Sequence, residues 1–141
     1  MISFHNADHP YRHRQIRKTR AWLEALIHGY DKDVGEIAIV FCTDSYLLEI
    51  NQKELNHHDF TDIITFDYCA GDLISGDLYI SIDRIRENAR KFQVSSLEEM
   101  SRVMAHGVLH LIGFQDKTPQ TQAAMRSAEN RALAELFHVK P

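Results

Sequence analysis

The sequence predicts a single α+β domain built from a small mixed β-sheet and about five helices. Its length of 141 residues is that of one domain and is sufficient to bury one hydrophobic core. Hydrophobic residues make up 44% of the chain and charged residues 26%, which is typical of a globular protein. Apolar runs and helical stripes follow the order strand–helix–strand–helix–strand–strand, and three further helices complete the chain.

The bounds of the expected elements follow from the spacing of the apolar residues. Strands are expected over residues 2–5, 37–42, 63–68 and 78–81, and helices over residues 11–27, 44–55, 83–92, 96–112 and 119–136. The strands are short runs or alternations of β-branched, aliphatic and aromatic residues, whereas the helices repeat apolar residues every three or four positions. Residues 70–77 contain two glycines and two aspartates, so we expect a turn there that joins a hairpin.

Several helix ends carry signals of their own. Pro10 is expected to open the first helix, because proline suits the first helical turn. Ser95 or Ser96, followed by two glutamates, predicts a capped start for the fourth helix. Gly113 is expected to end that helix, and Pro119 to begin the last one.

The charges are unevenly distributed along the chain. The net charge of −4 excludes a uniformly basic nucleic-acid-binding domain. Residues 1–30 carry five Lys or Arg and two Asp or Glu, whereas residues 31–81 carry two and eleven. The basic residues of the first segment are Arg12, Arg14, Arg17, Lys18 and Arg20. They form either a solvated helix face or a patch that binds a polyanion.

Other features predict a cytoplasmic protein with no membrane association. No run approaches the ~18 apolar residues that a membrane-spanning helix needs. The N-terminus lacks the basic start and apolar stretch of a secretory signal. Cys42 and Cys69 form no C-x-x-C pair and are expected to be reduced thiols, although the sequence leaves one disulfide open.

The residues that carry chemistry lie between positions 105 and 116. His106 and His110 are four positions apart, so on a helix their rings share one face and can bind one Zn²⁺. Gly113 permits a chain reversal, after which Asp116 can return its carboxylate to the metal. Two histidines and one carboxylate leave a coordination position open, which is typical of a catalytic zinc site.

Position 107 distinguishes two classes of metal-dependent hydrolase. In H-E-x-x-H metalloproteases, the glutamate that follows the first histidine is the general base. Here that residue is Gly107, which cannot accept a proton, so peptide hydrolysis by that scheme is disfavoured. A phosphodiester is a more natural substrate, since a metal ion stabilises charge on phosphoryl oxygens.

Three motifs resemble those of the YbeY family, which are bacterial endoribonucleases. The stretch H-G-V-L-H-L-I-G-F-Q-D over residues 106–116 resembles the family signature H-G-x-L-H-L-x-G-x-x-H. Residues 55–56 and 61–66, L-N and T-D-I-I-T-F, resemble the family's L-N and T-D-V-L-S-F. Residues 76–81, G-D-L-Y-I-S, resemble its G-D-I-x-I-S. The similarity extends from about residue 36 to the C-terminus.

The resemblance implies that residues 1–141 form one YbeY-like metal-dependent hydrolase domain with a centrally placed zinc-binding helix. It implies one Zn²⁺ per chain and the cleavage of single-stranded RNA. It further implies a role in 16S ribosomal RNA 3′-end maturation and ribosome quality control, with the ribosome or its subunit as a partner. The metal ligands carry over as His106 and His110, with Asp116 in place of the family's usual third histidine. Asp116 is a competent oxygen ligand for zinc.

A second departure concerns the loop after Asn56, which is shorter than in the family. The family commonly has an arginine there that is thought to face the RNA, whereas this chain offers only His57 and His58. Thr61 and Asp62 have either a functional role or a structural role in a turn. The basic residues of the third helix either follow an RNA backbone or lie on a solvated surface; they are Arg84, Arg86, Arg90 and Lys91.

Three functions remain open from the sequence, and they belong to different classes. The leading prediction is a zinc-dependent endoribonuclease, with either water or the RNA 2′-hydroxyl as the attacking group. The alternatives are a metalloprotease-like hydrolase and a non-catalytic ribosome-assembly factor with a structural metal. The sequence identifies no catalytic acid or base.

Overall fold

The computed structural model describes residues 1–55 and 61–138, which form four strands and five helices. In chain order these are β1 (Ile2–Asn6), α1 (Ile16–Gly29), β2 (Asp33–Cys42), α2 (Asp44–Leu55), β3 (Ile63–Asp67), β4 (Leu73–Ser81), α3 (Ile82–Phe92), α4 (Ser96–Ile112) and α5 (Pro119–Phe137). The predicted order of elements and the predicted α+β class are confirmed.

The strands form one mixed sheet in the order β1-β2-β4-β3. Strands β1, β2 and β4 are parallel, and β3 is antiparallel to β4. The parallel pairs are joined by helical crossovers, as parallel connections require. The short link between β3 and β4 makes the expected hairpin, and it places β3 at the edge of the sheet.

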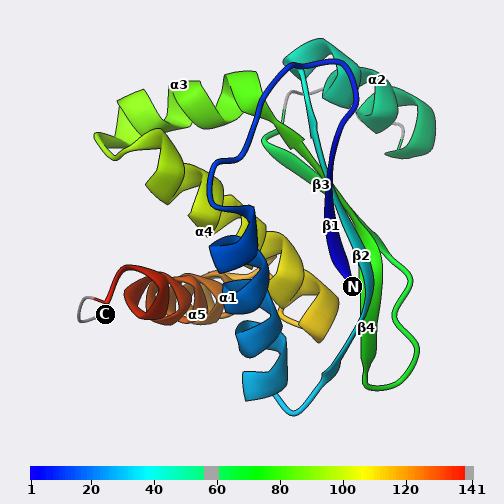
Figure 1. Ribbon diagram of the computed structural model, residues 1–141, viewed down its shortest axis with the longest axis vertical. Coiled ribbons are helices and arrows are strands. Elements are labelled where there is room, and N and C mark those ends of the chain that lie inside the picture. The colour runs from blue at the N-terminus through cyan, green and yellow to red at the C-terminus, as the bar shows by residue number, and fades with distance from the viewer. Residues whose placement is uncertain (56–60, 139–141) are drawn as a thin grey trace.

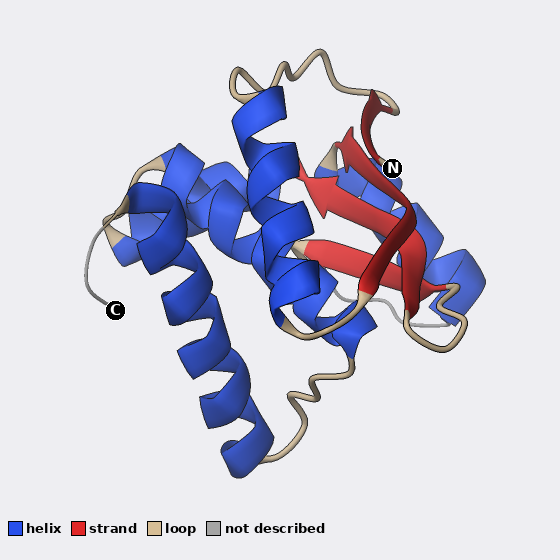
Figure 2. Ribbon diagram, turned by 60° about the horizontal axis from the view of Figure 1, so that its bottom comes forward, coloured by secondary structure: helices blue, strands red, loops and turns tan. Residues whose placement is uncertain are grey.

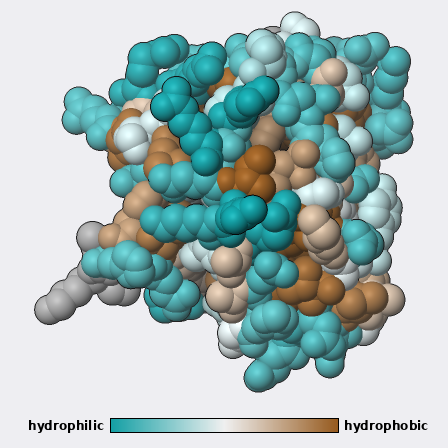
Figure 3. All heavy atoms as spheres, viewed as in Figure 1, coloured by the Kyte–Doolittle hydropathy of each residue, from teal (hydrophilic) through white to brown (hydrophobic). Residues whose placement is uncertain are grey.

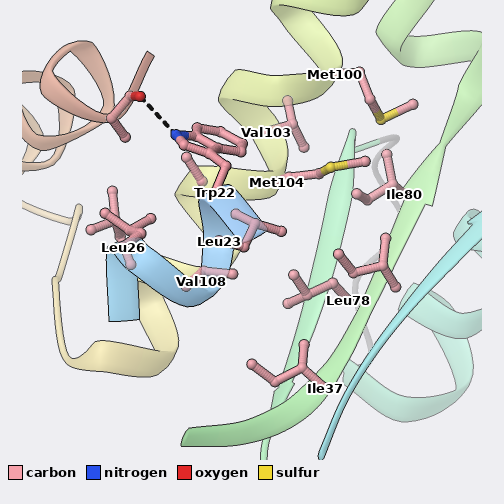
Figure 4. Close-up of a cluster of buried hydrophobic side chains, with 14 of the residues drawn as sticks. Trp22, Leu23, Leu26, Ile37, Leu78, Ile80, Met100, Val103, Met104 and Val108 are labelled. Carbon is pink, nitrogen blue, oxygen red and sulfur yellow. Dashed lines mark hydrogen bonds between the residues drawn. The ribbon is translucent and has the colours of Figure 1, made fainter. Parts of the chain in front are cut away.

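The helices cover the two faces of the sheet unequally. Figure 1 shows α1, α4 and α5 on one side of the strands and α2 on the other. Figure 2 shows the same separation after rotation, with most of the helical mass on one face. The larger core lies on that face and is drawn in Figure 4, where Leu23, Met104 and Leu78 come from α1, α4 and β4. A smaller cluster, centred on Leu47 and Ile64, lies under α2.

Helix α4 occupies the centre of this arrangement, as expected. It contacts α1, α3, α5, β3 and β4. Its apolar residues are buried on both the sheet side and the α5 side. Trp22 of α1 also fixes α5, because its indole Nε1–H donates a hydrogen bond of 2.8 Å to the carbonyl oxygen of Ala132 (Figure 4). Helix α4 is therefore enclosed by the sheet and by α1, α3 and α5.

The expected caps define the ends of α4 and α5. The Ser95 hydroxyl accepts a hydrogen bond of 3.0 Å from the backbone N–H of Glu98 and caps α4. Gly113 follows the last helical residue with a φ of 128°, a conformation that a side chain would strain. Thr118 caps α5, and Pro119 is its first residue. These caps set the short turn between α4 and α5, on which Asp116 lies.

The prediction that the first helix begins near Tyr11 was wrong, because α1 begins at Ile16. His13 is buried, and its ring bonds Thr19 Oγ1 at 2.7 Å and the Tyr11 hydroxyl at 3.0 Å. These contacts hold the residues before Ile16 in a loop against the edge of the core. Tertiary packing therefore overrides the local signal of Pro10.

The second and fourth strands are longer than predicted. Strand β2 begins at Asp33 rather than 37, and β4 begins at Leu73 rather than 78. The register pairs Asp33 with Leu73 and Ile37 with Gly76. The expectation of a turn over residues 70–77 is thus wrong beyond 72, because the second half of that segment is a strand that needs β2 as its partner.

The structure bears on two expectations from the sequence, which concern the cysteines and membrane-spanning helices. Cys42 and Cys69 are both free thiols, and burial raises the pKa of Cys42 to about 12. Within residues 1–55 and 61–138, the helices are too short or too polar to span a bilayer.

We expect Gly76→Ala to destabilise the protein. A Cβ atom at this position would overlap the carbonyl oxygen of Phe66 and lie 2.9 Å from a methyl group of Leu111. The free energy of unfolding, measured in urea, should fall by roughly 1–3 kcal/mol. Gly29→Ala is the matched control, because a Cβ atom there meets nothing within 4 Å and should stabilise the chain by about 0.4–1 kcal/mol. Equal stability of the two variants would contradict the argument.

Candidate metal centre and cleft

Three side chains converge where α4 ends and the chain turns toward α5. His106 and His110 lie one helical turn apart, and their Nε2 atoms are 3.0 Å apart. After Gly113 the chain reverses and returns Asp116 to the same point. Its Oδ2 atom is 3.2 Å from Nε2 of His110 and 3.4 Å from Nε2 of His106. The structure therefore brings together the three residues that the sequence nominated, and such a group can hold a metal ion.

The outer ring nitrogens determine which atoms face the centre of this group. Nδ1 of His106 lies 2.7 Å from Oε2 of Glu129, and Nδ1 of His110 lies 2.9 Å from the carbonyl oxygen of Phe114. Both partners only accept hydrogen bonds, so each Nδ1 carries the proton and donates. In the neutral imidazoles both Nε2 atoms then present lone pairs toward each other and toward Asp116.

This arrangement fits a bound cation. Three acceptor atoms 3.0–3.4 Å apart repel one another unless a positive charge lies between them. A tetrahedral ion with ligand distances of 2.0–2.1 Å separates its ligands by about 3.3 Å, which matches the group. Hydrogen bonds from the outer nitrogens to a carboxylate and a carbonyl are also the usual support of metal-binding histidines.

Glu129 is the principal residue of the site that the sequence did not reveal. It lies on α5, 23 positions from His106, and its side chain is only 6% exposed. Its other oxygen accepts a hydrogen bond of 3.0 Å from Arg102 of α4. The available signal was an acidic residue on the buried stripe of α5, beside Ala128 and Ala132. Only the packing of α5 on α4 shows which histidine that residue meets.

The charges around His106 shift two pKa values in opposite directions. Burial alone would lower the pKa of His106, but the hydrogen bond and charge of Glu129, with the charge of Asp116, raise it. Burial alone would raise the pKa of Glu129, but its hydrogen bonds to His106 and Arg102 lower it. Glu129 is thus ionised at neutral pH.

The group lies where two connected hollows meet. The larger hollow, about 700 Å³, extends over β3 toward α2, and the smaller, about 360 Å³, lies between α3, α4 and α5. Both are lined by Asp62, Ile63, His106 and Asp116. Burial raises the pKa of Asp62, and burial together with the charge of Asp62 raises the pKa of Glu99 in the smaller hollow. The cleft therefore contains carboxyl groups that retain a proton to higher pH than usual.

Thr61 and Asp62, the first residues of the T-D motif, have different surroundings in the structure. The Thr61 hydroxyl donates to the carbonyl oxygen of Ile63 at 3.4 Å, which is a local structural contact. Asp62 bonds Ser81 through its backbone, while the residue lines both hollows. His57 and His58 lie outside the described residues.

The basic residues nominated from sequence do not gather at this cleft. Arg84 pairs with Asp44 at 2.8 Å, and the Nε–H of Arg20 donates to the carbonyl oxygen of Ile2. Arg12, Arg14, Arg17 and Lys18 are exposed. Figure 3 shows hydrophilic side chains spread over this face of the molecule, with hydrophobic ones between them. None of the nominated arginines and lysines lines the described part of either hollow.

Gly107 faces the sheet. A Cβ atom there would lie 2.8 Å from Cδ1 of Ile63 and 3.0 Å from the methyl groups of Leu78, inside the contact between α4 and the sheet. The position that carries the general base in H-E-x-x-H proteases is thus occupied by sheet packing, and it cannot present a carboxylate to the metal group.

Comparison with known proteins identifies close relatives. The family model described as "Endoribonuclease YbeY" matches residues 2–137. A curated protein named Endoribonuclease YbeY from Flavobacterium psychrophilum is 50% identical over 140 residues, which is 99% of each chain. One of the same name from Bacteroides thetaiotaomicron is 50% identical over 118 residues, covering 84% of this chain and 86% of that one.

A solved structure shares the fold. The solution structure of TM1509 from Thermotoga maritima superposes with a TM-score of 0.70 and covers 98% of this chain and 90% of its own. The two sequences are 22% identical, so this similarity concerns the fold alone.

We expect Glu129→Gln to lower the pKa of His106 in the metal-free protein, because the variant keeps the shape of the carboxylate and removes its charge. The raised pKa means that the pair stabilises the fold fully below about pH 6.5, the unfolded value. That contribution is lost as the pH rises through the folded pKa of His106. NMR titration of the imidazole ring protons measures the shift.

Glu135→Gln is the control for this titration, since it removes the same charge from an exposed position of α5. It should leave the pKa of His106 in place. An unchanged pKa in Glu129→Gln would show that the short contact contributes no net electrostatic stabilisation.

Proposed function

Because the chain belongs to the YbeY family of endoribonucleases, we propose that it is a zinc-dependent endoribonuclease specific for single strands, acting in 16S ribosomal RNA 3′-end maturation and ribosome quality control. The observation that supports this most directly is the convergence of His106, His110 and Asp116 at the meeting point of two hollows. The expected partners are single-stranded RNA and the ribosome or its subunit. The expected location is the cytoplasm, where free thiols remain reduced.

His106, His110 and Asp116 would hold one zinc ion per chain. Two imidazoles and one carboxylate are a ligand set found in catalytic zinc sites, which keep one position open. When bound, the ion supplies Lewis acidity that stabilises negative charge on a phosphoryl oxygen.

The other residues of the site orient these ligands and manage protons. Glu129 and the carbonyl oxygen of Phe114 fix the rotation and the tautomer of the two imidazoles. Asp62 lies in the cleft beside His106, and burial favours its protonated form.

The alternatives predict different outcomes of one experiment. A metalloprotease-like hydrolase is disfavoured, because position 107 faces the sheet. A non-catalytic assembly factor with a structural metal would bind RNA without cleaving it. A purely structural metal does not account for a metal group that lines a cleft of about 700 Å³, because structural sites are closed and carry no substrate cleft.

The proposed activity is tested with untagged protein of measured metal content. We expect cleavage of single-stranded RNA, little cleavage of duplex RNA or single-stranded DNA, and no cleavage of casein. A chelator should abolish the activity and added zinc should restore it. Cleavage that persists in the His106→Ala and His110→Ala variants would indicate a contaminating nuclease. Intact RNA together with bound zinc would favour the assembly factor.

The assignment of Asp116 as third ligand has its own test. Asp116→Ala should weaken zinc binding by more than the roughly 10- to 100-fold expected for loss of an outer partner. Asp116→His should restore binding, and Asp116→Asn should be intermediate, because it keeps the shape and loses the charge. Competition with a chromophoric chelator measures the affinities.

Asp67→Ala is the matched control, since Asp67 lines the same hollow but is not part of the metal group. It should bind zinc as the wild type does. If Asp116→Ala also does so, Asp116 only shapes the turn before Pro119, and another residue completes the site.

A further inference from the structure

We propose that the smaller hollow binds one unstacked base of a single-stranded RNA, with the ring of Phe92 as its stacking surface. The proposal rests on the proposed function for the identity of the polymer. The hollow has a volume of about 360 Å³ and ends at His106 and Asp116 of the metal group. A strand whose phosphate lies at that group would therefore place a neighbouring nucleotide in the hollow.

Phe92 has the exposure and the position of a stacking residue. It is the last residue of α3, lines the hollow, and is 55% exposed. Lys91 holds its ammonium group 5.7 Å from the centre of the ring. Exposed aromatic rings with neighbouring cations are the usual surfaces on which single-stranded nucleic acids stack their bases.

Helices α3 and α5 supply polar groups that can meet the edge of a base. The side-chain amides of Asn88 and Gln122 hydrogen-bond to no other residue within 1–55 and 61–138. Arg126 is 65% exposed and approaches Glu129 only at 3.6 Å. Two unpaired amides and a guanidinium offer the donors and acceptors with which proteins bind the edges of unpaired bases.

The charges of the hollow favour a neutral base over a phosphate or an acidic peptide. Glu99 and Glu129 are buried in its wall, 5% exposed each. The guanidinium of Arg102, which also lines the hollow, is already bonded to Glu129 and Asn130. An anion placed there would face buried carboxyl groups, and the other guanidinium of the lining, that of Arg126, is exposed and already 3.6 Å from Glu129; an uncharged heteroaromatic ring would not meet this repulsion.

This placement gives single-strand preference a structural cause. A base in a duplex is paired and stacked, so its face cannot reach Phe92 without extrusion from the helix. The hollow therefore selects strands whose bases are already free.

Equilibrium binding of fluorescent eight-nucleotide single-stranded RNAs, measured by anisotropy, tests the proposal. The full chain is used as purified, with a parallel sample in chelator that prevents cleavage. Phe92→Leu should raise Kd by roughly 5- to 100-fold, the value of one stacked base, and Phe92→Trp should restore binding. Tyr68→Leu is the control, because Tyr68 is 61% exposed but lines neither hollow.

A second series moves one abasic residue along the strand. At one position, loss of the base should weaken binding to the wild type and leave binding to Phe92→Leu unchanged, because the partner ring is already absent. A Kd of Phe92→Leu within twofold of the wild type, or equal abasic effects in both proteins, would overturn the proposal. Binding and cleavage are measured separately, so the two proposals can fail independently. If the protein cleaves RNA but Phe92→Leu does not change its Kd, the endoribonuclease activity stands and the base site alone is rejected.

Discussion

The close approach of α4 to the β3–β4 pair is the constraint on which the site depends. Two glycines make it possible from opposite sides. Gly107 of α4 leaves room for Leu78, and Gly76 of β4 leaves room for Leu111. With the helix seated this close to β3 and β4, His106 and His110 line a cleft beside β3.

Partial burial of the polar side chains of α4 destabilises the fold unless each of them has a hydrogen-bond or charge partner. The two imidazoles and Asp116 are partly buried, and their facing atoms are all acceptors. In water such a group would disperse, but here α4, the turn at Gly113 and the start of α5 hold it together. With both imidazoles neutral, the repulsion among these acceptor atoms is relieved by a bound cation, which is typical of pre-organised metal sites.

Local signals in the sequence predicted most of helix α4 and of the metal group. The features that they did not predict depend on tertiary contacts. The serine cap of α4, the stop at Gly113 and the spacing of His106 and His110 are properties of neighbouring residues, so they could be predicted. Glu129 could not be paired with His106, because the pairing depends on how α5 crosses α4. The early parts of β2 and β4 were missed for a similar reason, since each is a strand only beside the other.

Arg102 explains how a buried carboxylate can serve His106 in both of its charge states. When the imidazole is protonated, it is itself the counter-charge of Glu129. When the imidazole is neutral, as a metal ligand must be, the negative charge of Glu129, which is only 5% exposed, would remain without a counter-charge from His106. The guanidinium of Arg102, 3.0 Å from the other carboxylate oxygen, supplies the missing charge. In the proposed site a proton and a metal ion would compete for Nε2 of His106; Glu129 raises the pKa of this imidazole and orients it, while Arg102 balances the charge of Glu129.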